Sequence, residues 1–132
     1  MNFTKLQGAG NDFVLVETGG VERDWSQLAK AMCDRHYGIG SDGLLLLSSS
    51  AVADFKMRMF NPDGSEAEAC GNGLRCFARY VLDRGLIDSQ ASGITLETRA
   101  GVSQVTFNRV GGRVPTIRVS LGKPRFAAAE IP

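Results

Sequence analysis

Long apolar runs and an excess of charge of either sign are both missing from this sequence of 132 residues. Its apolar runs, such as residues 44–47 (LLLL), are far shorter than the roughly 18 residues that a membrane span needs. Fifteen Lys and Arg residues nearly balance fourteen Asp and Glu residues, so the net charge is +1. Because proteins that bind nucleic acid or membrane surfaces normally carry a basic excess, we expect neither of these partners.

Cysteine and histidine are also scarce. The sequence has three cysteines, Cys33, Cys70 and Cys76, and one histidine, His36. An odd number of widely spaced cysteines does not suit a disulfide framework, and the lack of a Cys-x-x-Cys pair argues against a structural zinc site. The first residues (MNFTKLQGAGNDF) lack the basic segment and apolar stretch of a secretory signal. We therefore expect a cytoplasmic protein without a bound metal.

The composition itself, 43% apolar and 22% charged, is that of a globular protein, and the length suits one domain. A first helix should begin at the N-cap Asp24, with Gln27 as its capping-box partner, run to about His36 and end at Gly38. Apolar residues at helical spacing between positions 74 and 82 predict a second helix that Gly85 ends. Residues 65–70 are expected to be a loop. Short apolar or alternating runs predict strands at residues 4–6, 13–16, 44–47, 55–60, 102–107 and 114–121.

Residues 38–43 (GIGSDG) match the bare pattern GxGxxG. A dinucleotide site needs a strand before this pattern and a helix after it, whereas here a predicted helix precedes it and a predicted strand follows. We interpret the segment as a turn. Because no lysine has the setting of a Schiff base and no phosphate loop is present, we expect no cofactor.

The segment Cys70-Gly71-Asn72-Gly73 opens the second predicted helix. A thiol at a helix N-terminus lies near the positive end of the helix dipole, which lowers its pKa. The glycines expose backbone N–H groups that can bind a carboxylate, and Asn72 can donate its side-chain amide to the same anion. The alternative is a buried Cys70 beside glycines that only form a turn. Cys76 and Cys33 are expected to pack in the core.

Asn11 lies in a predicted glycine-flanked loop after a strand, and Asn61 precedes a proline, which favours an extended backbone. Both asparagines are candidates to present a side-chain amide to a polar ligand. Either could instead stabilise a local turn, which is the commoner role of asparagine in loops.

Three segments together resemble the diaminopimelate epimerase family: residues 8–13 (GAGNDF), 60–65 (FNPDGS) and 69–79 (ACGNGLRCFAR). The resemblance extends over the whole chain. It implies an α+β fold in which a mixed, barrel-like sheet wraps around a central helix. That fold is one lobe of a two-lobed enzyme, with the active site between the lobes. The enzymes of this family interconvert LL- and meso-2,6-diaminopimelate, in lysine and peptidoglycan precursor synthesis, without a cofactor.

The resemblance also implies residue roles. Cys70 corresponds to the catalytic acid/base of the first lobe, Gly71 and Asn72 to the anion-holding helix start, and Asn11 and Asn61 to substrate contacts. A further family contact falls on Gly43, which has no side chain to offer.

Inverting a carbon centre by two bases needs a second proton donor on the opposite face, about 7 Å from the first. Cys76 leaves the same helix in another direction and cannot supply it. The family takes this group from a C-terminal lobe, and the sequence contains no second Cys-Gly helix start. Residues 1–132 are therefore expected to be a single N-terminal lobe that is inactive alone. Two alternatives remain, a homodimer with facing Cys70 residues and a non-catalytic module that binds carboxylates or senses thiol oxidation.

Overall fold

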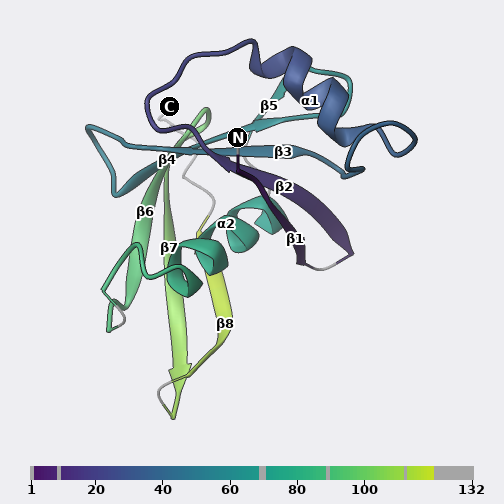
Figure 1. The fold of residues 1–132 in the computed structure, drawn as a ribbon. Helices are drawn as coiled ribbons and strands as arrows, with labels where there is room; N and C mark the ends of the chain where they lie inside the picture. The colour runs from purple at the N-terminus through teal and green to yellow at the C-terminus, as the bar shows by residue number, and fades with distance from the viewer. Residues whose placement is uncertain (1, 9, 69–70, 89, 112, 121–132) are drawn as a thin grey trace, which may run out of the picture.

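The computed structural model describes residues 2–8, 10–68, 71–88, 90–111 and 113–120, and within these segments it contains one sheet and two helices (Figure 1). The helices are α1 (Trp25–Cys33) and α2 (Gly71–Asp83). The strands are β1 (Thr4–Gly8), β2 (Asn11–Glu17), β3 (Leu44–Ser48), β4 (Phe55–Phe60), β5 (Glu66–Ala67), β6 (Gly93–Thr98), β7 (Gly101–Val110) and β8 (Arg113–Ser120).

The sheet is mixed and curves around α2. Its strand order is β1-β2-β3-β4-β6-β7-β8, with the short β5 paired to β4. The pairs β2/β3 and β4/β6 are parallel and the others are antiparallel. The helix α2 contacts β1, β2 and β3 on one side and β7 and β8 on the other, and Figure 1 shows it in the concave space of the sheet. The predicted α+β fold with a barrel-like sheet around a central helix is confirmed.

Two cores lie on opposite faces of β2 and β3. On the concave face, the α2 residues Leu74, Phe77 and Val81 are completely buried against the sheet. On the convex face, side chains of β2 and β3 pack against Trp25 and Ala29 of α1. Strands that are buried on both faces read as unbroken apolar runs, because neither face has to be polar. This double burial explains the sequences FVLV in β2 and LLLL in β3, and it confirms the predicted buried strand at residues 44–47.

The boundaries of α1 are partly as predicted. The Asp24 carboxylate accepts the N–H of Gln27 at 3.1 Å, which confirms the N-cap. The predicted end near His36 is wrong, because α1 ends at Cys33. The side chain of Asp34 accepts the N–H groups of His36 and Tyr37 and turns the chain away from the helix.

Gly38 does not cap α1, although a helix ending there was expected. It packs against the helix backbone, where an added Cβ would lie only 2.0 Å from the carbonyl oxygen of Ala31. Glycine is required at this position because of the close approach. The end of α2 agrees with the prediction, since Gly85 has φ of 67° and the N–H of Leu86 reaches back to the carbonyl of Val81 at 3.0 Å.

Two differences from the predicted strands affect the site. Asn11 is the first residue of β2 and pairs with Gly8, so it lies at a strand end and not in an open loop. The segment predicted as a loop at 65–70 contains β5, whose two residues are too few to show a periodic pattern.

In the described part of the chain, neither helix is long and apolar enough to cross a lipid bilayer.

Candidate functional site

Strand pairing brings several predicted site residues to one end of the sheet. The parallel register aligns Val14 with Leu44, so the starts of β2 and β3 lie side by side. The antiparallel register aligns Leu44 with Phe60, so the end of β4 lies at the same edge. Asn11 begins β2, Gly43 precedes β3 and Asn61 follows β4. The sheet therefore gathers residues that are up to 50 positions apart in the sequence.

The start of α2 reaches this edge through a pair of asparagines. Asn72, the second residue of the helix, donates from Nδ2 to Oδ1 of Asn11 at 2.6 Å. Arg75, one turn further along α2, donates from Nη1 to Oδ1 of Asn72 at 3.3 Å. Two of the residues predicted to contact a ligand are thus in direct contact with each other. They lie where the positive end of the helix dipole favours an anion.

Gly71 is the first residue of α2, as the sequence predicts. An added Cβ there would lie 3.3 Å from Nη1 of Arg75, so a side chain would crowd the guanidinium that holds Asn72. Cys70, the predicted acid/base, lies outside the described residues. Cys76 and Cys33 are both buried, in agreement with the prediction that they pack in the interior.

Asn61 lies at the same end of the sheet, and its hydrogen bonds form a local turn. Its Nδ2 donates to Oγ of Ser65 at 3.0 Å, and its backbone N–H donates to the carbonyl of Ser65 at 2.8 Å. The carbonyl of Asn61 accepts the N–H of Gly64 at 2.9 Å. These hydrogen bonds place the Asn61 side chain in a local turn, one of the two roles that the sequence left open, and they do not test a contact with substrate.

Gly43 is a packing position between strands. Its carbonyl oxygen accepts hydrogen bonds from the N–H of Val14 and from Oγ of Ser41, each at 3.0 Å. An added Cβ would lie 3.1 Å from the carbonyl oxygen of Phe60. The tight approach leaves little room for a side chain at this position.

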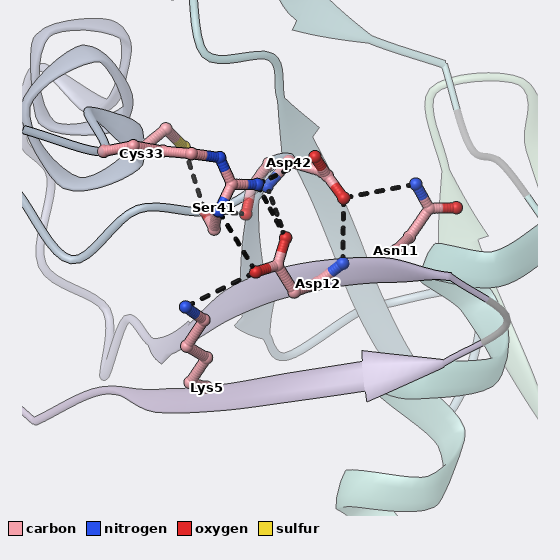
Figure 2. Close-up of polar contacts among 8 residues, drawn as sticks. Lys5, Asn11, Asp12, Cys33, Ser41 and Asp42 are labelled. Atoms are coloured by element: carbon pink, nitrogen blue, oxygen red, sulfur yellow. Dashed lines mark hydrogen bonds and ion pairs between the residues drawn. The ribbon is translucent and has the colours of Figure 1, made fainter.

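A charged cluster that the sequence analysis missed lies next to Asn11 (Figure 2). Asp12, the neighbour of Asn11 in β2, and Asp42, just before β3, exchange hydrogen bonds. The N–H of Asp12 donates to Oδ2 of Asp42 at 2.9 Å, and the N–H of Asp42 donates to Oδ1 of Asp12 at 3.1 Å. Nη2 of Arg35 lies 3.0 Å from a carboxylate oxygen of each aspartate. Lys5 adds a second cation, 3.4 Å from Asp12. We call Asp12, Arg35 and Asp42 the charged cluster.

Together with Lys5, the charged cluster is electrostatically balanced, because its two carboxylates face two cations. Two carboxylates this close repel each other unless cations lie between them. The hydrogen bond from Arg35 is the main reason that the pKa of Asp12 falls from 3.8 to about 2, and Asp42 and Lys5 lower it further while burial opposes the shift. Both aspartates follow glycine-rich segments that precede predicted strands, and this repeated placement was the available signal for them in the sequence.

We expect the low pKa of Asp12 to make the stability of the chain depend on pH in acid. The pKa of Asp12 is about 2 in the folded chain and ordinarily 3.8, so ionised Asp12 stabilises the fold at pH values above 3.8. This contribution is lost as the pH falls toward the folded value. Urea unfolding of the wild type and of Asp12→Asn between about pH 2 and pH 5 measures the effect. The difference in the free energy of unfolding between the wild type and Asp12→Asn should be largest at the upper end of this pH range and shrink toward the lower end. A difference that does not change with pH would contradict the lowered pKa of Asp12.

One hollow borders Asn11 and another borders α2. The first, of about 400 Å³, is lined by Gln7, Gly8, Gly10 and Asn11 at the turn between β1 and β2. A second, of about 340 Å³, lies between β1, α2 and β8. A separate hollow of about 630 Å³ lies against Tyr80 and Arg84, near the other end of α2. Among the residues placed by the structure, no group of three or more His, Cys, Asp or Glu side chains could hold a metal ion.

Solved structures with this fold include a hydroxyproline epimerase and a phenazine biosynthesis protein. A hydroxyproline epimerase from Agrobacterium vitis aligns with a TM-score of 0.69 and 17% identity, over 89% of this chain and 40% of that one. A Bacillus anthracis phenazine biosynthesis protein of the PhzF family aligns with a TM-score of 0.64 and 24% identity, over 83% of this chain and 35% of that one. At these identities the likeness concerns the fold alone.

Sequence comparison is more specific. Diaminopimelate epimerase from Caldanaerobacter subterraneus subsp. tengcongensis is 50% identical over 133 aligned residues, which cover 100% of this chain and 47% of the relative. The enzyme of the same name from Methanococcus maripaludis is 47% identical, and the alignment again covers 100% of this chain and 47% of the relative. The chain therefore spans about half the length of these relatives. The sequence model of the family, described as diaminopimelate epimerase, matches residues 3–127. With the match extending over nearly all of its length, the chain belongs to the diaminopimelate epimerase family.

Proposed function

We propose that this chain is the N-terminal lobe of a cofactor-independent epimerase that interconverts LL- and meso-2,6-diaminopimelate. The single observation that supports this most is the match of the family model over residues 3–127, together with identities near 50% to curated diaminopimelate epimerases. The contact between Asn11 and Asn72 adds local support, because it joins two proposed substrate contacts at the start of α2.

The proposed chemistry is proton transfer at an α-carbon. The α-proton of an amino acid is very weakly acidic, so its removal needs an activated base and stabilisation of the negative charge that develops. We assign the base to the thiolate of Cys70, which precedes Gly71, the first residue of α2. In this assignment the backbone N–H groups at the start of α2 and the amide of Asn72 hold the substrate carboxylate. Asn11 and Asn61 contact the rest of the amino-acid group.

The second acid/base is proposed to come from a second lobe. A two-base inversion needs proton carriers on both faces of the carbon, and Cys76 is buried in the core on α2, the helix that Cys70 directly precedes in the sequence. We therefore assign the partner to a cysteine outside residues 1–132 and propose that the chain alone does not epimerise diaminopimelate. We propose further that the enzyme works in the cytoplasm, in lysine and peptidoglycan precursor synthesis.

Solvent isotope exchange tests the proposal. The full-length protein and the 132-residue chain are incubated separately with LL-diaminopimelate in D₂O, and deuterium at the α-carbons and the ratio of isomers are followed by NMR. We expect the full-length protein to exchange the α-proton and to form the meso isomer, and the chain alone to form none. Failure of the full-length protein to epimerise would remove the proposed activity.

Epimerisation by the isolated chain would contradict the need for a second lobe. Size-exclusion chromatography then separates the remaining cases. A dimer whose activity disappears in Cys70→Ala would support facing Cys70 residues in two copies, whereas an active monomer would exclude the two-lobe mechanism. If neither the full-length protein nor the isolated chain is active, titration of the Cys70 thiol tests the remaining alternative, a non-catalytic module that senses thiol oxidation. A pKa near or above the ordinary 8.5 would leave no activated thiol for catalysis or for sensing.

A further inference from the structure

A directional series of hydrogen bonds runs from α2 to the charged cluster. Arg75 donates to Oδ1 of Asn72, Asn72 donates from Nδ2 to Oδ1 of Asn11, and Asn11 donates from Nδ2 to Oδ2 of Asp42 at 3.3 Å. The series begins at a cation and ends at an anion, and each of the two amides accepts on its oxygen and donates from its nitrogen.

Asp42 determines the direction of this series. An ionised carboxylate only accepts hydrogen bonds, so the group of Asn11 that faces it must be the NH₂. Oδ1 of Asn11 is then turned toward α2, where it meets the NH₂ of Asn72. A neutral partner at position 42 could accept or donate, and it would leave both orientations of the Asn11 amide open.

Asp42 is itself held in one orientation. Its Oδ1 lies 3.0 Å from Nη2 of Arg35, and its Oδ2 accepts from the N–H of Asp12 at 2.9 Å as well as from Asn11. Both carboxylate oxygens are thus engaged by separate donors. Figure 2 shows the Asp42 carboxylate joined by dashed lines to the Asn11 side chain and to the backbone N–H of Asp12.

We propose that Asp42, held by Arg35, is a positioning residue that sets the orientation of the Asn11 amide and, through it, of Asn72. The proposal rests on the proposed function, in which both asparagines contact the substrate. It adds a residue that touches no substrate but determines which face of each amide the substrate meets.

The variant that tests this is Asp42→Asn in the full-length protein. Its single side-chain oxygen cannot serve both Arg35 and the N–H of Asp12. The charged guanidinium is the stronger donor, so the new NH₂ should turn toward Asn11 and force that amide to rotate. We expect kcat/KM for epimerisation to fall roughly 10- to 100-fold, as for a misplaced substrate contact. Asp12→Asn is the matched control, since Asp12 shares Arg35 whereas the Asn11 NH₂ is directed at Asp42, and kcat/KM of this variant should fall less than about 3-fold.

A double-mutant cycle separates positioning from general damage. If Asp42 acts through Asn11, Asp42→Asn should cost less than about 2-fold in an Asn11→Ala background, because the amide that it orients is gone. Equal losses with and without Asn11, or no loss in the wild type, would overturn the proposal. Arg35→Gln is the second variant if Asp42→Asn does not fold, and the same dependence on Asn11 is expected of it.

An NMR readout keeps the test independent of activity. The side-chain NH₂ signals of Asn72 should shift on Asp42→Asn in the presence of Asn11 and stay unchanged in the Asn11→Ala background. Unchanged Asn72 signals in both backgrounds would refute the positioning role. A wild-type protein that does not epimerise would refute the proposed function alone, and the NMR comparison would still decide the role of Asp42.

Discussion

Replacing Cys70 by alanine in the full-length protein is expected to lower kcat for epimerisation at least about 100-fold in both directions. In a two-base mechanism the group that removes the proton in one direction returns it in the other, so loss of one thiol blocks both. The measurement is the initial rate of isomer formation from LL- and from meso-diaminopimelate, with the fold of each variant checked by circular dichroism.

Cys33→Ala is the matched control. Cys33 is also a cysteine of this lobe, but it is buried at the end of α1, where its sulfur lies 3.2 Å from Oγ of Ser41. This variant should lose some stability and keep its activity within a few-fold of the wild type. If Cys70→Ala keeps more than about a tenth of the wild-type rate, Cys70 is not the general acid/base.

Replacing Phe77 by alanine is expected to destabilise the chain by about 3–5 kcal/mol, the range for truncating a buried phenylalanine. Phe77 is 0% exposed on the concave side of the sheet, and its ring meets that of Phe55 edge-on at a centroid distance of 6.4 Å. The variant loses this apolar burial and leaves a cavity between α2 and the strands around it. Urea unfolding followed by circular dichroism measures the change in free energy.

Phe3→Ala removes the same side chain from the surface. Phe3 is 47% exposed and precedes β1, so its replacement should change the free energy of unfolding by no more than about 0.5 kcal/mol. Similar losses for the two variants would show that α2 is not the centre of the core.

Local patterns predicted the helices and the buried strands well, for identifiable reasons. The spacing of apolar residues around Phe77 identified α2, and Gly85 marked its end. The unbroken run in β3 indicated a strand covered on both faces. The end of α1 was missed because the side chain of Asp34 competes for the backbone N–H groups that follow it, and this competition interrupts a pattern that otherwise suits a helix.

The site was predictable only as separate segments. The chain by itself determined that a helix begins at Gly71 and that Asn11 and Asn61 lie beside turns, because capping, glycine geometry and apolar spacing act over a few neighbouring residues.

Tertiary structure alone decided which of these segments meet. The contact between Asn11 and Asn72 joins residues 61 positions apart, and that between Asp12 and Asp42 joins residues 30 positions apart. These contacts depend on the parallel register of β2 with β3 and on how α2 packs against the sheet. Both are set by long-range burial of apolar side chains, which has no local counterpart in the sequence.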